Sequence, residues 1–127
     1  MPLLFQHRIY QSDLVNNPGV FYIFGDNEAR RGRGGQAKEC RGHSNAIGIA
    51  TKIRPSNSEG SFWSDEDYDR CKAIIDSDFQ PVFDALKSGN IVVCPSDGIG
   101  SGLSRLPVLA PRLFAYIRSQ IKLSKTL

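Results

Sequence analysis

The feature that most constrains this fold is a pair of glycine-rich segments, each of which comes after a short, continuous run of apolar residues. The first apolar run is residues 20–24, and residues 32–37 form the glycine-rich segment that follows it. The second run is residues 91–94, followed by the segment 95–102. β-Branched and aromatic runs of this length are typical of buried strands in parallel sheets. Because ligands of such sheets bind beyond the carboxyl ends of strands, both segments are expected at a ligand-binding edge.

The rest of the chain alternates between strand and helix patterns. Residues 3–10 and 46–51 are short apolar runs that predict two more strands, and polar insertions in the first indicate a sheet edge. Apolar residues at three- to four-residue spacing predict a helix from about Ser64, which Pro81 should kink or split. A last helix is predicted from about Pro111. This alternation predicts an α/β fold with parallel core strands.

Length and composition favour one globular domain over residues 1–127. Of these residues 40% are hydrophobic and 23% are charged, which argues against a disordered or membrane protein. The N-terminus lacks the pattern of a signal peptide, so a cytoplasmic protein is expected. Three widely spaced cysteines predict reduced, buried thiols, and neither a metal nor a cofactor is expected. The net charge of +3 favours a local anion site over a protein that coats nucleic acid.

The glycine-rich segments have the composition of an anion site. Glycine lets backbone N–H groups approach an oxygen anion closely, and Gly32, Gly34 and Gly35 fit that role. A short helix predicted to run to about Cys40 would add its positive end. Neither segment matches a Walker A loop or the strict dinucleotide fingerprint. Two such loops could close on a diphosphate from opposite sides, although the glycines could instead only form tight turns.

Basic residues surround the first segment and leave two interpretations open. Arg33 lies inside the glycine cluster and is the one expected to contact a phosphate. The wider basic surface from Arg30 to Arg41 could instead attract a nucleic-acid backbone or a protein partner, with no small-molecule pocket. A run of charges is also typical of a solvated face.

Four short motifs occur in an order that points to a known family. They are Ser12-Asp13-Leu14, the run from Gly25-Asp26-Asn27 to Gly35-Gln36-Ala37, Thr51-Lys52, and Ile99-Gly100-Ser101-Gly102-Leu103 with the following Arg105-Leu106. This order resembles the macrodomain fold, specifically the branch that includes the terminal ADP-ribose protein glycohydrolase. The second motif also resembles one found in short bacteriophage and bacterial proteins. The macrodomain resemblance implies a small three-layer α/β fold, with a mixed sheet flanked by helices.

The resemblance also implies a cleft that binds ADP-ribose or a related nucleotide. By this resemblance Asp13 would hydrogen-bond the adenine amino group, while Asn27 and Gly35 would face the distal ribose. The loops that would form the rest of the pocket contain Gly32, Arg33, Gly34, Gly35 and Gln36 in the first segment and Gly100, Ser101, Gly102 and Leu103 in the second.

Whether the protein only binds this ligand or also removes ADP-ribose from proteins or nucleic acids stays open. The resemblance puts Lys52 at the position of a nucleophilic lysine, which must lose its proton before it attacks a sugar carbon. Ser104 stands where the branch has an aspartate, so Asp97 or Asp26 would have to act as the acid. The alternatives are that Asp97 belongs to a turn and that Lys52 is a solvated strand-end charge.

Overall fold

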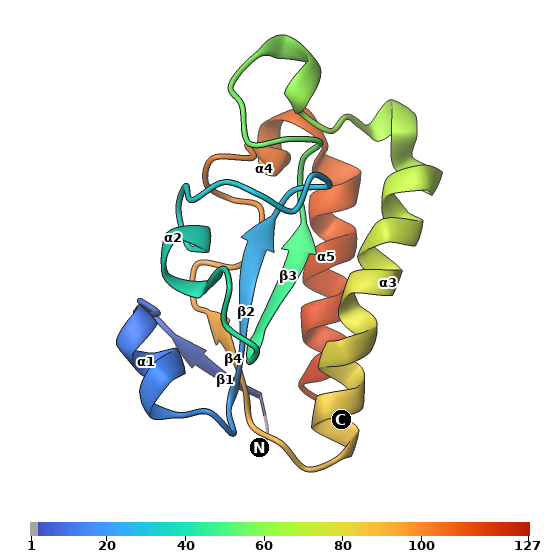
Figure 1. Ribbon diagram of the computed structural model, residues 1–127. Helices are drawn as coiled ribbons and strands as arrows, with labels where there is room; N and C mark the ends of the chain where they lie inside the picture. Colours follow the sequence, from blue (N-terminus) through green and yellow to red (C-terminus); the bar gives the residue numbers. More distant parts are fainter. Residues whose placement is uncertain (1–2) are drawn as a thin grey trace.

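Four strands form one parallel sheet in the computed structural model, which describes residues 3–127 (Figure 1). β1 (Leu3–Gln6), β2 (Phe21–Asp26), β3 (Ala46–Ala50) and β4 (Val92–Pro95) lie in the order β1-β4-β2-β3. The two most apolar runs therefore occupy the centre, and the first strand is at an edge as predicted. The α/β fold is confirmed. All pairings between these four strands are parallel, whereas the resemblance implied a mixed sheet.

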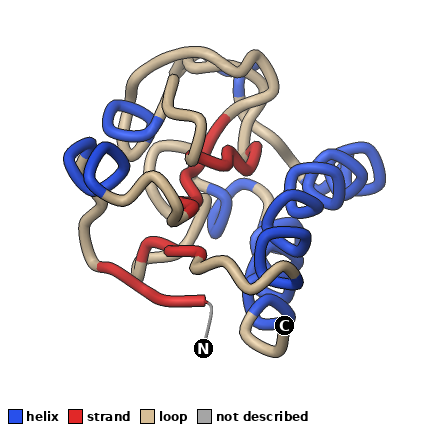
Figure 2. The backbone as a smooth tube through the Cα atoms, turned by 60° about the horizontal axis from the view of Figure 1, so that its bottom comes forward, coloured by secondary structure: helices blue, strands red, loops and turns tan. Residues whose placement is uncertain are grey.

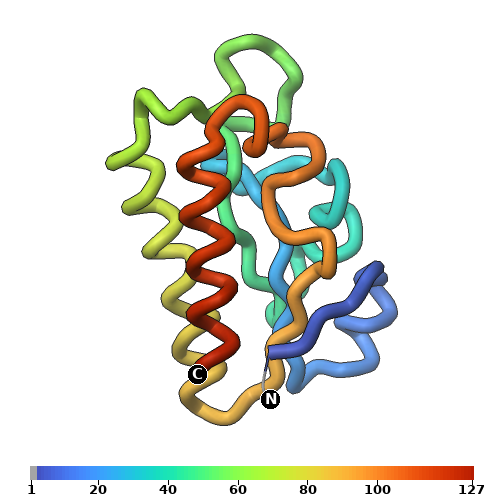
Figure 3. Tube along the Cα trace, turned by 180° about the vertical axis from the view of Figure 1, so that it is seen from behind, coloured from blue at the N-terminus to red at the C-terminus, as the bar shows by residue number. Residues whose placement is uncertain are grey.

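The larger core lies between one face of the sheet and two long helices. α3 (Tyr68–Lys87) and α5 (Pro111–Ser124) run side by side along this face (Figures 1 and 3). A 3₁₀ turn precedes α3, and the helix continues through Pro81 without being split. Ser77 and Pro81 are both exposed, so water can satisfy the carbonyl that the proline leaves without a donor.

Two short helices cover the other face of the sheet. α1 (Gln11–Asn16) and α2 (Ala37–Cys40) pack with Tyr22 and Phe24 in a smaller cluster. Figure 2 shows the strands between these short helices and the long pair. α1 was not predicted, because its six residues are too few to display a helical period.

The burial of the cysteines and the hydropathy of the helices can be compared with what the sequence predicts. All three cysteines are buried and free, and burial raises the pKa of Cys40 and Cys94 to about 12 and that of Cys71 to about 11. Within residues 3–127, no helix combines the length and the apolar character that crossing a membrane requires.

The parallel sheet places three connecting segments at one end of the molecule. The connections after β2, β3 and β4 all leave from the carboxyl ends of their strands (Figure 1). Both glycine-rich segments belong to these connections, so the fold brings them to the same edge, as predicted.

Candidate functional site

The two glycine-rich loops enclose a cleft of about 800 Å³. They also approach each other directly, since a β-carbon on Gly34 would lie only 2.9 Å from Cδ1 of Leu103. The segment after β3 contributes Pro55 and Asn57 to the cleft, and residues 7–10, after β1, line it as well. The site is therefore built from the connections that follow all four strands.

Nearly all of the predicted site residues line this cleft. They are Asp26, Asn27, Gly32, Arg33, Gly34, Gly35, Gln36, Lys52, Asp97, Gly100, Ser101, Gly102 and Leu103. Asp13 does not line it. Its Oδ2 accepts hydrogen bonds from the Tyr10 N–H and from Gln6 Nε2, both at 2.8 Å, because Asp13 lies in the first turn of α1 and caps that helix.

The first glycine-rich loop presents backbone N–H groups that have no partner within the protein. In the part of the chain that the structure describes, the N–H groups of residues 31–36 donate no hydrogen bond. Positive φ angles at Arg30 (56°), Gly32 (96°) and Gly35 (56°) interrupt the usual backbone of this stretch. Left-handed residues next to right-handed ones produce concave runs of N–H groups that bind anions. The four-residue α2 adds little of the helix-end charge that the sequence suggested.

The second loop has a similar run of free donors. Over residues 3–127, none of the N–H groups of residues 99–104 donates a hydrogen bond. The loop is held instead through the Gly100 carbonyl, which accepts hydrogen bonds from the Leu106 N–H at 3.0 Å and from Ser104 Oγ at 2.9 Å. Ser104 is buried, and its hydroxyl helps to close the loop through this hydrogen bond.

Asp97 lies in a tight turn at the start of the second loop. The Gly98 N–H donates to the Pro95 carbonyl at 3.0 Å and closes this turn, as the turn interpretation of Asp97 predicts. The Asp97 side chain is exposed and lines the cleft.

Two side-chain oxygens at the cleft are buried without a hydrogen-bond donor in the described chain. They are Oδ1 of Asn27 and Oε1 of Gln36. Asn27 is only 6% exposed, and its Nδ2 donates to the Arg31 carbonyl at 2.7 Å, which fixes the orientation of the amide. A buried acceptor that lacks a donor costs free energy, so both oxygens need a group that donates a hydrogen bond.

Lys52 is a buried cation at the cleft and is only 7% exposed. Its Nζ donates to the Ser56 carbonyl at 2.8 Å and lies 4.5 Å from the centre of the Phe62 ring. No carboxylate of residues 3–127 forms an ion pair with Lys52. Desolvation by burial lowers its pKa, which is the change that a nucleophilic amine requires.

Lys52 is expected to titrate below 10.5, the ordinary pKa of its amine. The folded protein then binds this proton less tightly than the unfolded chain, so stability rises with pH between the folded pKa and 10.5. An NMR titration of the lysine side chains measures the pKa, and Lys52→Met should remove this contribution to the pH dependence of unfolding. A measured Lys52 pKa of 10.5 or above would contradict the prediction.

Asp26 is held by two arginines at the end of β2. It is 7% exposed, and it forms ion pairs with Arg41 and, at 3.6 Å, with Arg30. Its Oδ1 also accepts the Asn27 N–H at 2.8 Å. Both carboxylate oxygens of Asp26 are thus engaged within the protein.

The basic surface from Arg30 to Arg41 is divided by these contacts. Arg30 and Arg41 are bound to carboxylates, while Arg31, Arg33 and Lys38 are exposed and line the cleft. The three cationic side chains of this surface without a carboxylate partner among the described residues therefore lie at the cleft. This position favours a ligand in the cleft over a separate surface for nucleic acid.

Sequence reasoning missed several residues of the site. The sequence places Arg41 in a basic surface and does not indicate its ion pair with Asp26, which ends a strand 15 residues earlier. Arg8 and Tyr10 line the cleft from the connection after β1, because the strand predicted over residues 3–10 ends at Gln6.

One family model matches almost the whole chain, including both loops. It is described as Family of unknown function (DUF7831) and matches residues 4–120. No curated protein and no solved structure matches the chain. The chain therefore belongs to the family of unknown function DUF7831.

Proposed function

We propose that the protein binds ADP-ribose or a related nucleotide diphosphate in the cleft between its glycine-rich loops. The observation that carries this proposal is that the cleft has two opposite hydrogen-bonding needs. The N–H groups of residues 31–36 and 99–104 have no acceptor within residues 3–127 and can donate to a ligand, whereas the buried oxygens of Asn27 and Gln36 lack a donor there. Phosphate oxygens supply acceptors and sugar hydroxyls supply donors. A sugar phosphate therefore meets both needs in one molecule.

The charge at the cleft supports an anionic ligand. Its lining includes cationic side chains that form no ion pair within residues 3–127, namely Arg8, Arg31, Arg33, Lys38 and Lys52. The carboxylates of Glu39 and Asp97 also line the cleft but are fewer. The excess of positive charge favours a ligand with more than one negative charge, such as a diphosphate.

Size and position support the same class of ligand. Small-molecule sites typically have volumes of about 300 to 1,000 Å³, and this cleft has about 800 Å³. It lies beyond the carboxyl ends of parallel strands, where such folds commonly bind nucleotides. Buried free thiols are compatible with a reducing compartment, and a cytoplasmic location is part of the proposal.

Hydrolysis of ADP-ribose from a modified protein or nucleic acid is the second candidate. The observation that favours it is the lowered pKa of the buried Lys52 amine at the cleft. Asp97 is the available acid, because Asp26 is occupied by its two arginines. Turnover of an ADP-ribosylated substrate that is lost in Lys52→Ala, while ADP-ribose binding is kept, would establish this activity.

Calorimetric titration with ADP-ribose tests the binding proposal. We expect saturable binding of ADP-ribose and weaker binding of inorganic pyrophosphate, because only ADP-ribose brings hydroxyl donors. Asn27→Ala should weaken ADP-ribose binding about tenfold, with a smaller effect on pyrophosphate. Asn16→Ala serves as control, because Asn16 is an exposed residue of α1 that does not line the cleft. Absence of binding at millimolar ADP-ribose would reject the proposal. Binding of nucleic acid with a steep salt dependence would then favour the basic-surface alternative.

A further inference from the structure

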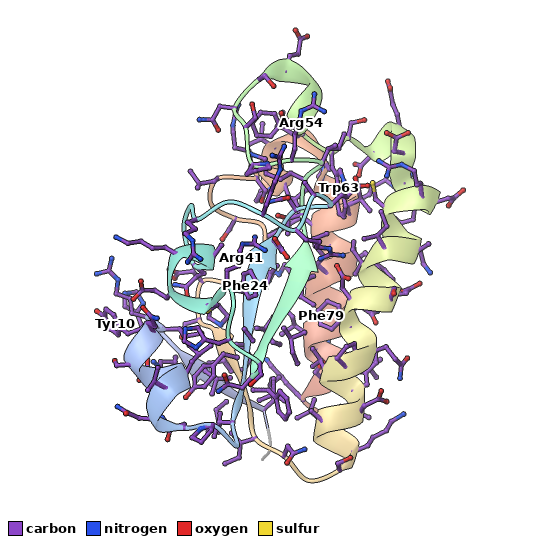
Figure 4. The ribbon with its side chains drawn as sticks, in the orientation of Figure 1. Tyr10, Phe24, Arg41, Arg54, Trp63 and Phe79 are labelled. Atoms are coloured by element: carbon purple, nitrogen blue, oxygen red, sulfur yellow. The ribbon has the colours of Figure 1, made fainter. Side chains whose placement is uncertain are left out.

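Arg41, at the end of α2, joins the first glycine-rich loop to the sheet. Its Nε donates to the Gly32 carbonyl at 2.7 Å, and its Nη2 donates to the Arg31 carbonyl at 3.2 Å. The same Nη2 forms the ion pair with Asp26. The guanidinium also lies 5.6 Å from the centre of the Phe24 ring, and Figure 4 labels both side chains beside β2. Arg41 therefore contacts the loop and the central strand at once.

Asp26, the ion-pair partner of Arg41, is itself held firmly in place. Asp26 is the last residue of β2, and its Oδ1 accepts the Asn27 N–H. Gly48 on the neighbouring strand packs tightly against it, since a β-carbon there would lie 2.6 Å from Asp26 Oδ2. The Asp26 carboxylate thus has little room to move. Because Arg41 is bound to it, the loop carbonyls that Arg41 contacts are also held in place.

The bonded carbonyls determine where the loop N–H groups point. In a trans peptide the C=O of one residue and the N–H of the next point in opposite directions. Because the Gly32 carbonyl points to Arg41 and the Arg31 carbonyl points to both Arg41 and Asn27 Nδ2, the N–H groups of Gly32 and Arg33 point away from these donors. Both residues line the cleft, and their N–H groups lack partners among the described residues.

We propose that Arg41 is a positioning residue, which holds the Arg31 and Gly32 carbonyls so that the following N–H groups are preorganised for a phosphate. This inference rests on the proposed function only in taking the ligand to carry a phosphate. A lysine at this position would keep the charge but could not make the same set of planar, forked contacts. The loop would then lose its fixed geometry, and the free energy needed to order it on binding would lower the affinity for anions.

The test compares Arg41→Lys with wild type in two measurements. NMR relaxation of the ligand-free protein reports backbone order, and we expect order parameters for residues 31–36 to fall from about 0.85 to below about 0.6. Titration with inorganic pyrophosphate should show binding weakened about tenfold. Arg70→Lys is the matched control, because Arg70 also binds a carboxylate, Glu28 at 2.8 Å, but does not line the cleft. It should change neither measurement.

The outcomes separate this inference from the proposed function. Unchanged loop order in Arg41→Lys, unchanged pyrophosphate affinity, or no pyrophosphate binding by wild type would each overturn the inference. Pyrophosphate binding that depends on Arg41, without any ADP-ribose binding, would keep the inference and reject the proposed function. Should Arg41→Lys fail to fold, Asp26→Asn removes the charge of the anchor and is expected to disorder the same loop.

Discussion

Replacement of Gly100 by alanine is expected to lower the free energy of unfolding by about 3 kcal/mol. Gly100 has a φ of 93°, a conformation that strains any residue with a β-carbon. The added β-carbon would also lie 2.5 Å from Cδ1 and 3.2 Å from Cγ of Leu106. Because Leu106 is fully buried, it has no free space into which it could retreat.

Gly98 and Gly102 allow the cost of backbone strain to be measured separately from the cost of steric overlap with Leu106. Gly98 also has a positive φ, 84°, but nothing lies near the place of its β-carbon, so Gly98→Ala should cost about 1 kcal/mol from backbone strain alone. Gly102 has neither feature, and Gly102→Ala should stay within about 0.5 kcal/mol of wild type. Chemical denaturation measures all three variants. A Gly100→Ala protein as stable as Gly102→Ala would show that the loop is not packed as described.

Truncation of Phe79 to alanine is expected to cost about 4 kcal/mol of folding stability. Phe79, labelled in Figure 4, is fully buried in the larger core. Its ring centre lies 5.8 Å from that of the partly buried Phe83. Removing the ring leaves a cavity on the face of the sheet that α3 and α5 cover, and Phe79 does not line the cleft. Folded molecules of this variant should therefore keep their affinity for ADP-ribose.

Phe83→Ala on the same helix is the comparison, measured by denaturation under the same conditions. Since Phe83 is only partly buried, its truncation should cost clearly less than that of Phe79. Equal losses for the two variants would contradict the arrangement of this core.

The strands could be predicted because each central strand is a continuous apolar run with turn residues on both sides. Residues 20–24 and 91–94 give β2 and β4 to within two residues at each end. α1 could not be predicted in this way, since its one buried residue, Leu14, leaves no periodicity. The four-residue α4 (Leu106–Leu109) was missed for the same reason.

The site was predictable where it depends on chain order and was not where it depends on distant contacts. Glycines that follow central strands must meet at one edge of a parallel sheet, so both loops were expected together. The pairing of Arg41 with Asp26 crosses a turn and a helix, and no sequence spacing indicates it. The family resemblance implies that Asp13 binds adenine. In the structure Asp13 accepts a hydrogen bond from the Tyr10 N–H and caps α1, a local contact that the resemblance does not indicate.

The most direct test of the central claim is a ¹H–¹⁵N NMR titration of the protein with ADP-ribose. If both glycine-rich loops bind one ligand, the N–H signals of residues 31–36 and 99–104 will shift together and follow a single binding curve. Signals that shift in one loop only, or in neither loop at millimolar ligand, would contradict the claim that the two loops form one phosphate-binding cleft.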